Sequence, residues 1–251
     1  MQLGGYLKLT LLDYTGYVSA MCFTKGCQLR CPFCHNAELV LPKLQKNDID
    51  AEKASYDFLS YLEQRKSMLD GVVVTGGEPL LQKDLKDFMH RIKGLGLSIK
   101  LDTNGLMTEK LKELIENKLV DYVALDYKNT REHFCKTVGI FSTKCRESAD
   151  KYYDNWENSL DYLRKHNVPY ELRTTVIKEL HPLSVLLEMA QSIQYNAPAD
   201  ELWFIQKYVK NAPVINDYQT NKIAMTPYTT EEMKDIEKAL SKTEYKVIFR
   251  N

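Results

Sequence analysis

Three cysteines near the start of the chain have the spacing of a metal-binding loop. Cys27, Cys31 and Cys34 form the pattern CxxxCxxC directly after an apolar run. A structural zinc site and an ordinary ferredoxin cluster each need four ligands, and here the fourth cysteine is missing locally. Three thiolates on a four-iron cluster would leave one iron open to an external ligand. The alternative is a zinc site completed by His35, although adjacent Cys34 and His35 would reach one tetrahedral ion only with difficulty.

A second short motif follows the next apolar run. Gly76, Gly77, Glu78 and Pro79 stand directly after residues 71–75. Glycines at such a turn let backbone amides approach a ligand without a Cβ in the way, and Glu78 could accept a hydrogen bond from an ammonium group. The alternative is an ordinary glycine-rich turn with an exposed acid. The motif is neither GxGxxG nor a Walker sequence with its lysine, so a nucleotide-phosphate fold is not indicated.

Composition argues against several broad classes of protein. The 251 residues include 34 Lys and Arg and 34 Asp and Glu, so the net charge is zero and no nucleic-acid partner is expected. No apolar run approaches the roughly 18 residues of a membrane helix. The amino-terminal segment has no charged region followed by an apolar one, so we expect no signal peptide and a cytoplasmic protein. In that compartment clustered cysteines bind metal or do chemistry more often than they form disulfides.

The motifs must be positioned by the elements around them, which alternate between apolar runs and amphipathic segments. We predict core strands at 18–23, 71–75, 97–101, 122–125, 170–176, 202–205 and 245–249, and a strand outside the parallel core at 6–12. Predicted helices start after an N-cap at Asp50 and cover 84–95, 108–118, 156–168, 182–193 and 230–240. Segment 129–150 has weak periodicity and is predicted to be a long loop with short helical pieces.

Strands that alternate with helices predict a parallel sheet with right-handed crossovers. The sheet could be doubly wound or a partial barrel, whereas the number of units disfavours a full eightfold barrel. No repeat, low-complexity tract or Gly/Ser linker divides the sequence, so we predict a single domain over 1–251.

The two motifs together, CxxxCxxC after the first core strand and Gly-Gly-Glu-Pro after the second, resemble those of radical S-adenosylmethionine enzymes. The longer string from Phe23 to Leu39 resembles the glycyl-radical-enzyme activases, most of all the anaerobic ribonucleoside-triphosphate reductase activating proteins. The resemblance covers most of 6–250 and is stronger before Lys128 than after it. It implies an α/β fold with a partial (β/α)6 open barrel, one 4Fe–4S cluster and S-adenosyl-L-methionine as cofactors.

The activity implied by this resemblance is reductive cleavage of S-adenosylmethionine at the cluster. The 5′-deoxyadenosyl radical would then generate a glycyl radical on a partner, an anaerobic ribonucleotide reductase, with flavodoxin or ferredoxin as reductant. One alternative is a radical enzyme acting on a small molecule, such as a 7-carboxy-7-deazaguanine synthase. The other is a non-catalytic metal-binding module, which would leave the glycine motif unexplained.

The resemblance also implies roles for individual residues. Those that would hold the cluster are Cys27, Cys31 and Cys34. Those that would contact S-adenosylmethionine are Phe33, Gly76, Gly77, Glu78, Asp102, Asn104, Lys128 and Arg173. Those that would surround a monovalent cation are Asp102, Thr103 and Asp126.

Some of these matches are specific to one part of the cofactor. Phe33 matches a position near the adenine, and Lys128 matches a lysine near the methionine carboxylate. The segment ending at Glu78 matches the one that binds the methionine amino group. Arg173 and Thr175 fall in the ribose-contacting region. Gln206 stands where the pyruvate formate-lyase type has a histidine near the adenosine.

Each polar candidate also has an ordinary structural explanation. Asp102 could cap a helix, Lys128 could be a solvated loop charge, and Arg173 could be an ion-pair partner. Taken together, however, the candidates lie at the carboxyl ends of successive predicted strands. Active sites of parallel α/β barrels form at that end, so the shared position favours a site.

The other cysteines and histidines are weaker candidates. Cys22 is predicted to be a small buried hydrophobe. Cys135 and Cys145 lack the CxxC pairs expected of a second cluster. The histidines without ligand spacing, which we predict to lie at the surface or at helix termini, are His90, His133, His166 and His181.

Overall fold

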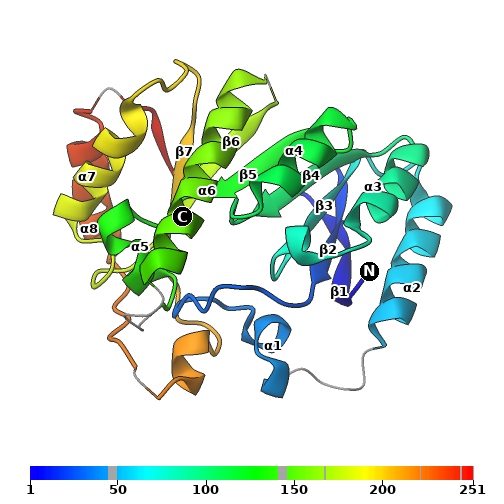
Figure 1. Cartoon of the computed structure of the whole chain (residues 1–251), viewed down its shortest axis with the longest axis horizontal. Helices are drawn as coiled ribbons and strands as arrows, with labels where there is room; N and C mark the ends of the chain where they lie inside the picture. Colours follow the sequence, from blue (N-terminus) through cyan, green and yellow to red (C-terminus); the bar gives the residue numbers. More distant parts are fainter. Residues whose placement is uncertain (45–49, 141–145, 167, 221, 244, 251) are drawn as a thin grey trace.

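The computed structural model describes residues 1–44, 50–140, 146–166, 168–220, 222–243 and 245–250 (Figure 1). Their strands form one eight-stranded sheet, in which the order in space is the order in the chain. The strands are β1 (Leu3–Thr10), β2 (Ser19–Thr24), β3 (Gly71–Gly76), β4 (Ser98–Thr103), β5 (Tyr122–Asp126), β6 (Tyr170–Val176), β7 (Trp203–Lys207) and β8 (Val247–Arg250). β1 pairs antiparallel with β2, and every later pair is parallel.

The order of the strands decides between the two predicted architectures. A doubly wound sheet reverses its direction of growth partway, whereas this sheet grows in one direction from β1 to β8. Among the described residues β1 and β8 are the two edges of the sheet, so the barrel is open. The predicted partial barrel is confirmed, and the doubly wound alternative is wrong.

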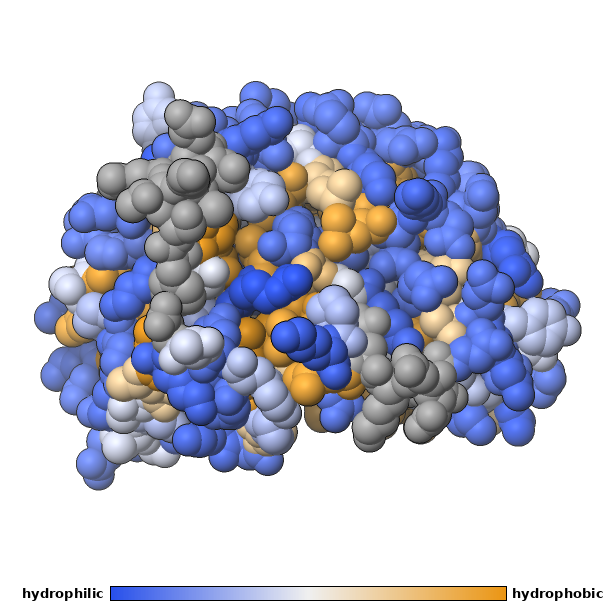
Figure 2. Space-filling view, turned by 60° about the horizontal axis from the view of Figure 1, so that its bottom comes forward, coloured by the Kyte–Doolittle hydropathy of each residue, from blue (hydrophilic) through white to orange (hydrophobic). Residues whose placement is uncertain are grey.

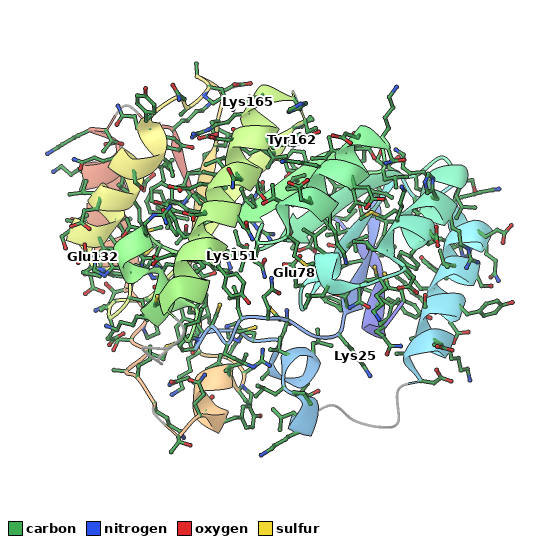
Figure 3. The ribbon with its side chains drawn as sticks, viewed as in Figure 1. Lys25, Glu78, Glu132, Lys151, Tyr162 and Lys165 are labelled. Carbon is green, nitrogen blue, oxygen red and sulfur yellow. The ribbon has the colours of Figure 1, made fainter. Side chains whose placement is uncertain are left out.

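Helices cover the outside of the sheet (Figure 1). They are α1 (Ala37–Val40), α2 (Ala51–Arg65), α3 (Leu85–Gly94), α4 (Thr108–Glu116), α5 (Arg131–Thr137), α6 (Arg146–Lys165), α7 (Leu183–Gln194) and α8 (Thr230–Leu240), with short 3-10 turns η1 (Pro42–Leu44), η2 (Pro79–Leu81) and η4 (Ile215–Tyr218). In Figure 3, Lys151, Tyr162 and Lys165 follow α6 along this outer layer, whereas Glu78 lies among the loops at the strand ends. Within the described ranges, no helix is long and apolar enough to cross a membrane.

Helix α2 shows how a local signal sets a boundary. The Asp50 side chain accepts hydrogen bonds from the backbone amides of Glu52 and Lys53, each at 3.0 Å, as predicted for an N-cap. Phe58 and Leu62, one helical turn apart, are fully buried on the face toward the sheet. The N-cap and the apolar stripe, both visible in the local sequence, therefore indicate where this helix begins and which face it buries.

Segment 129–150 is more helical than predicted. It contains α5, and α6 begins at Arg146 rather than near Trp156. The first turns of α6 are polar in sequence and carry no apolar stripe, so periodicity cannot detect them. Tyr153 and Trp156 are buried further along the helix and anchor it by tertiary packing. Residues 141–145, which also belong to the predicted loop, lie outside the described residues.

Strand β1 also differs from its prediction, because it begins at Leu3 and ends at Thr10. Leu3 is fully buried and pairs with Thr24 of β2, which extends the strand toward the amino terminus. Leu11 and Leu12 are exposed and lie beyond the pairing with β2. The predicted bounds 6–12 are therefore wrong at both ends, because the prediction included apolar residues that do not pair with β2.

Charged side chains occupy the interior of the barrel. Lys100 Nζ donates a hydrogen bond to the carbonyl oxygen of Asp13 at 2.7 Å and forms an ion pair with Glu171 Oε1 at 3.3 Å. Arg250 Nη2 pairs with Glu171 Oε2 at 2.8 Å. Burial opposes ionisation of Glu171, but Lys100 and Arg250 outweigh it and hold the pKa of this carboxyl below its usual range. Such charges are tolerated inside a protein when they are paired.

Replacing Glu171 by alanine should lower the free energy of unfolding by about 3 kcal/mol, because buried Lys100 would lose the nearer of its two carboxylate partners and keep only Asp102 Oδ1, at 4.0 Å. Because the pKa of Glu171 is lower in the folded chain than in the unfolded chain, its ionised form stabilises the fold at pH values above the unfolded pKa. This stabilisation is lost as the pH falls through the folded pKa. The difference between wild type and variant should therefore shrink on acidification, as urea denaturation at several pH values would measure. Glu113→Ala, which removes an exposed partner of Lys86, is the control, and it should change the free energy of unfolding far less because solvent screens the exposed pair. Equal losses in both variants would contradict the prediction.

Candidate active site

One pocket collects the residues that the sequence singles out. It encloses about 280 Å³ at the carboxyl ends of the strands, on the face that Figure 2 brings forward, where apolar side chains gather among hydrophilic ones. The predicted residues that line it are Cys27, Cys31, Phe33, Cys34, Gly76, Gly77, Glu78, Asp102, Thr103, Asn104, Asp126, Lys128, Arg173, Thr175 and Gln206. Every residue predicted to bind a metal or a cofactor therefore lies at this one place.

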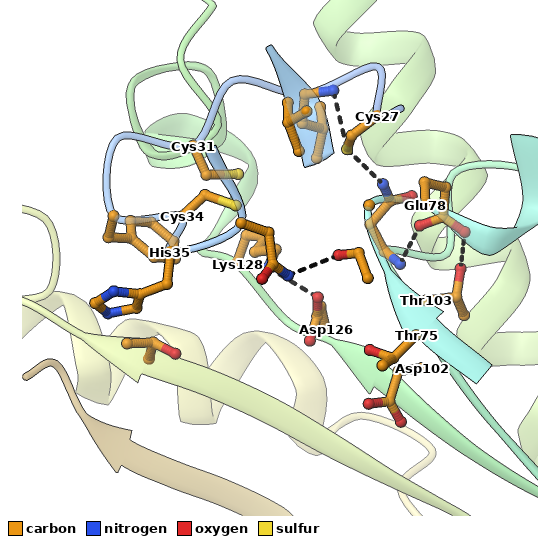
Figure 4. Close-up of a pocket in the computed structure, with 18 of the residues that line it drawn as sticks. Cys27, Cys31, Cys34, His35, Thr75, Glu78, Asp102, Thr103, Asp126 and Lys128 are labelled. Atoms are coloured by element: carbon orange, nitrogen blue, oxygen red, sulfur yellow. Dashed lines mark hydrogen bonds and ion pairs between the residues drawn. The ribbon is translucent and has the colours of Figure 1, made fainter. Parts of the chain in front are cut away.

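The cysteine loop follows β2 and is held by residues far away in the sequence. The amide of Arg30 donates to the carbonyl of Val138 at 3.0 Å. The amide of Ile215 donates to the carbonyl of Cys34 at 3.1 Å, and that of Asn216 to the carbonyl of Pro32 at 2.9 Å. The three sulfur atoms face the pocket (Figure 4). Backbone hydrogen bonds on several sides thus fix the conformation that presents the thiols.

The thiols fit a multinuclear cluster better than a single metal ion. Among the described residues, no three His, Cys, Asp or Glu side chains converge closely enough to hold one ion. A 4Fe–4S cluster does not need such convergence, because each iron takes its own thiolate. The ring of His35, the fourth ligand of the alternative zinc site, stacks on Tyr208 at a centroid separation of 5.6 Å. The arrangement therefore does not support the zinc alternative.

The surroundings of the thiols act on their ionisation in opposite directions. Burial raises the pKa of Cys27 and of Cys31 to about 12, and it raises the pKa of Cys34 as well. The ammonium group of Lys128 opposes this effect at Cys31 and Cys34. Because iron binds the thiolate, a nearby cation favours the form that a cluster needs.

The glycine motif packs against the start of the cysteine loop. A Cβ on Gly77 would lie 2.0 Å from the carbonyl oxygen of Gly26, so only glycine fits there. The amides of Gly77 and Glu78 donate to the carbonyls of Thr24 and Gly26, both at 2.8 Å. The expectation that a glycine amide approaches a ligand is therefore wrong for Gly77, since the carbonyl of Thr24 already occupies its amide. Gly76 has a φ of +112°, which likewise requires glycine.

Glu78 is buried, not an exposed turn acid. Its Oε1 accepts hydrogen bonds from Thr103 Oγ1 at 2.7 Å and from the amide of Leu80 at 3.1 Å, and its Oε2 accepts one from the amide of Asn104 at 2.8 Å. Burial raises its pKa to about 7, although these donors favour the carboxylate. The side chain thus ties the end of β3 to the end of β4 (Figure 4).

A chain of four charged groups crosses the floor of the pocket. Arg173 binds Asp102 at 3.0 Å and Asp126 at 3.3 Å, and Lys128 Nζ binds Asp126 at 2.8 Å. Burial opposes ionisation of Asp126, but Lys128 and Arg173 outweigh it and lower its pKa. Asp102 Oδ1 is buried and has no hydrogen-bond partner among the described residues. Lys100 Nζ lies 4.0 Å from that oxygen, beyond hydrogen-bond distance, so the oxygen can still accept a hydrogen bond from a hydroxyl group or contact a cation.

His181 does not line the pocket but contacts two residues that do, a role that the sequence does not reveal. Of the two predicted positions the helix terminus is confirmed, because His181 directly precedes Pro182, the N-cap of α7, but the histidine is fully buried and not at the surface. Its Nδ1 accepts from the amide of Ile177 at 3.3 Å, so its Nε2 carries the hydrogen that reaches the carbonyl of Lys128 at 2.8 Å. Burial lowers its pKa to about 4, so the ring is neutral. The ring also meets Phe33 edge-on at 6.4 Å and supports both pocket residues.

The remaining weak candidates fall outside the site. Cys22 is fully buried, as predicted, and Cys135 is partly exposed. Cys145 lies outside the described residues. The pocket is also lined by residues to which the sequence analysis assigned no role: Leu29, Asn36, Val40 and Thr75.

Alanine at Cys27, Cys31 or Cys34 should abolish iron binding, because each thiol would hold one iron of the cluster. Chains reconstituted anaerobically should bind about four irons in the wild type and far fewer in these variants. Iron analysis and the visible absorption of the cluster would measure the difference. Cys135→Ala is the matched control and should keep its iron. Loss of iron from that control would contradict the assignment of a single cluster to this loop.

Known proteins resemble this chain in both sequence and fold. The sequence profile of the Radical SAM superfamily matches residues 21–182. A Methanocaldococcus jannaschii protein whose name assigns it to the glycyl-radical enzyme activating enzymes is 32% identical over 191 residues, which cover 76% of this chain and 74% of that protein. The pyruvate formate-lyase-activating enzyme of Listeria monocytogenes is 36% identical over 130 residues, which cover 46% of this chain and 50% of that enzyme.

A solved structure extends the comparison to the fold. Streptococcus suis SuiB bound to S-adenosylmethionine matches with a TM-score of 0.64 at 15% identity, over 90% of this chain and 48% of that one. The chain thus spans about half the length of SuiB and of the Listeria enzyme. These matches do not single out the activating proteins of anaerobic ribonucleotide reductase. They show that this chain belongs to the Radical SAM superfamily, where it groups with the glycyl-radical enzyme activating enzymes.

Proposed function

We propose that this chain generates a glycyl radical on an anaerobic ribonucleoside-triphosphate reductase. One observation carries the proposal: three thiols of one loop and the polar ends of β3 to β6 line the same pocket. A 4Fe–4S cluster and S-adenosylmethionine, bound there together, would supply a 5′-deoxyadenosyl radical that takes a hydrogen atom from a glycine of the partner. Flavodoxin or ferredoxin would provide the electron, and the cytoplasm is the expected compartment.

The proposal gives each end of the methionine moiety a partner of opposite charge. Glu78 would accept a hydrogen bond from the ammonium group, because its Oε2 accepts one bond from Asn104 and has a lone pair left. Lys128 would pair with the carboxylate. Phe33 would offer its ring to the adenine, and Lys128 Nζ already lies 5.7 Å from the centroid of that ring. The pocket thus provides complementary groups for a zwitterion with an aromatic base.

The polar floor would bind the rest of the cofactor. Asp102 Oδ1 is free to accept from a ribose hydroxyl or to bind a monovalent cation together with Thr103 and Asp126. Arg173 already places positive charge between the two carboxylates. A cation would share Asp102 Oδ1 with the ammonium group of Lys100, which lies 4.0 Å from this oxygen, while Arg173 holds the carboxylates in position.

Burial of these groups also serves the chemistry. Glu78, Asp102 and Asn104 are each less than one-tenth exposed, so few waters reach this part of the pocket. Electrostatic interactions are stronger in such surroundings than in bulk water. Exclusion of water also protects a reactive radical from side reactions until it meets its substrate.

Glu78→Gln should weaken binding of S-adenosylmethionine by roughly tenfold, because an uncharged amide oxygen binds the ammonium group less strongly than a carboxylate does. Glutamine keeps the shape of the side chain, but its NH2 group must face a backbone donor, the amide of either Leu80 or Asn104. Iron analysis beside the affinity measurement therefore checks that the cysteine loop stays loaded. Calorimetry on the cluster-loaded protein would measure the affinity. Glu113→Gln, which alters an exposed carboxyl on the outer layer, is the control and should bind as the wild type does. If Glu78→Gln kept its iron and bound S-adenosylmethionine as tightly as the wild type, the proposed contact with the ammonium group would be wrong.

Val209→Glu should lower the yield of glycyl radical on the partner by roughly tenfold and leave cofactor cleavage by dithionite intact. Val209 follows β7, is 52% exposed and stands next to Tyr208, which stacks on His35 at the pocket. A charge there would disturb a docked protein without touching the residues assigned to the cofactor. Electron paramagnetic resonance of the partner and chromatography of 5′-deoxyadenosine would measure the two activities.

Met68→Glu is the matched control for this experiment. Met68 is also an exposed apolar residue, at 65%, but it precedes β3 and so lies toward the opposite end of the barrel. The control should activate the partner as well as the wild type does. Turnover of a small purine-like substrate, with no radical formed on any glycyl radical enzyme, would replace the proposed function by a reaction of the deazaguanine type.

A further inference from the structure

Asn104 is the side chain that joins the glycine motif to the cysteine loop. Its backbone amide donates to Glu78 Oε2 at 2.8 Å, and its side-chain Nδ2 lies 3.8 Å from Cys27 Sγ, to which it donates. The same sulfur accepts the backbone amide of Leu29 at 3.4 Å. Asn104 is only 6% exposed, so these contacts are shielded from water. Cys27 Sγ therefore receives N–H groups from two sides.

The orientation of the Asn104 amide is determined by its neighbours. Its Oδ1 accepts from the backbone amide of Leu106 at 3.1 Å and from Gln28 Nε2 at 3.2 Å. A backbone amide can only donate, so the atom that faces Leu106 must be the oxygen. The nitrogen is thereby directed to Cys27 Sγ. If the amide were flipped, its NH2 group would face the donors of Leu106 and Gln28, and the three hydrogen bonds just described would be lost.

We propose that Asn104 is a positioning residue that raises the reduction potential of the cluster through its hydrogen bond to Cys27. The inference rests on the proposed function in one respect, namely that Cys27 holds a cluster iron. Reduction of a cluster adds negative charge that is shared with its sulfur ligands. An N–H donor stabilises the reduced form more than the oxidised form, so it makes the cluster easier to reduce.

The same geometry gives the residue a second consequence. Glu78 holds the Asn104 backbone and, under the proposed function, meets the ammonium group of S-adenosylmethionine. A shift of Glu78 on cofactor binding would be passed to Asn104 and on to the sulfur of Cys27. Three residues in direct contact thus connect the cofactor site to one ligand of the cluster.

The test compares Asn104→Ala and Asn104→Ser with the wild type, all loaded with cluster and free of S-adenosylmethionine. Serine can still accept from the Leu106 amide and keep the turn, but it is too short to reach the sulfur. Asn155→Ala is the matched control, because it removes another amide hydrogen bond to the same turn, from Asn155 Nδ2 to the carbonyl of Leu106 at 3.0 Å, and touches no sulfur. A redox titration followed by electron paramagnetic resonance measures the midpoint potential, and iron analysis measures occupancy.

We expect the Asn104 variants to keep their iron and to shift to a more negative potential, about tenfold in the reduction equilibrium, or about 59 mV for one electron. Asn155→Ala should match the wild type. If the alanine variant loses its cluster, the serine variant decides. A serine variant with normal iron and the potential of the wild type would overturn the inference about Asn104. A wild-type chain that binds no cluster would instead refute the proposed function.

Discussion

A charge that water cannot reach must find its partner within the chain, and this constraint shapes the interior of the barrel. The inward positions of β4, β5 and β6 carry charged groups of both signs, namely Lys100, Asp102, Asp126, Glu171 and Arg173. Asp126 pairs with Arg173 on the adjacent strand, whereas Lys100 and Asp102 of β4 reach past β5 to Glu171 and Arg173 of β6. Ion pairs across the interior thus join strands that the backbone ladder does not join directly. The result is a barrel with a polar lining, in which a ligand with several charges can be bound.

The carboxyl ends of the strands are tied together by equally local contacts. Gly77 lets β3 approach the backbone of Gly26, and Glu78 bridges from β3 to Thr103 and Asn104 on β4. The two short motifs of the sequence are therefore parts of one structure. A change in either motif would be felt by the other, because backbone atoms of the glycine motif and of the cysteine loop are in direct contact.

Much of the site could be predicted because parallel strands end at one edge. The thiol spacing and the polar residues after each apolar run were visible in the sequence, and the fold brought them together without exception among the site residues we predicted. The burial of Glu78 was not visible, because its partners Thr103 and Asn104 lie on the next strand. His181 carried no signal, since its role depends on the carbonyl of Lys128 and on no pattern of its own. The start of α6 was missed because polar turns held by later packing have no apolar stripe.

The dependence of the cysteine loop on distant residues has a consequence for biosynthesis. Pro32 and Cys34 are held by the amides of Asn216 and Ile215, which belong to the last part of the chain. A ribosome releases the cysteines long before it has made those residues, and amino-terminal segments emerge first. The nascent loop therefore lacks two of the hydrogen bonds that fix its shape. The loop can therefore reach the full conformation that presents its three thiols only after the last part of the chain has left the ribosome.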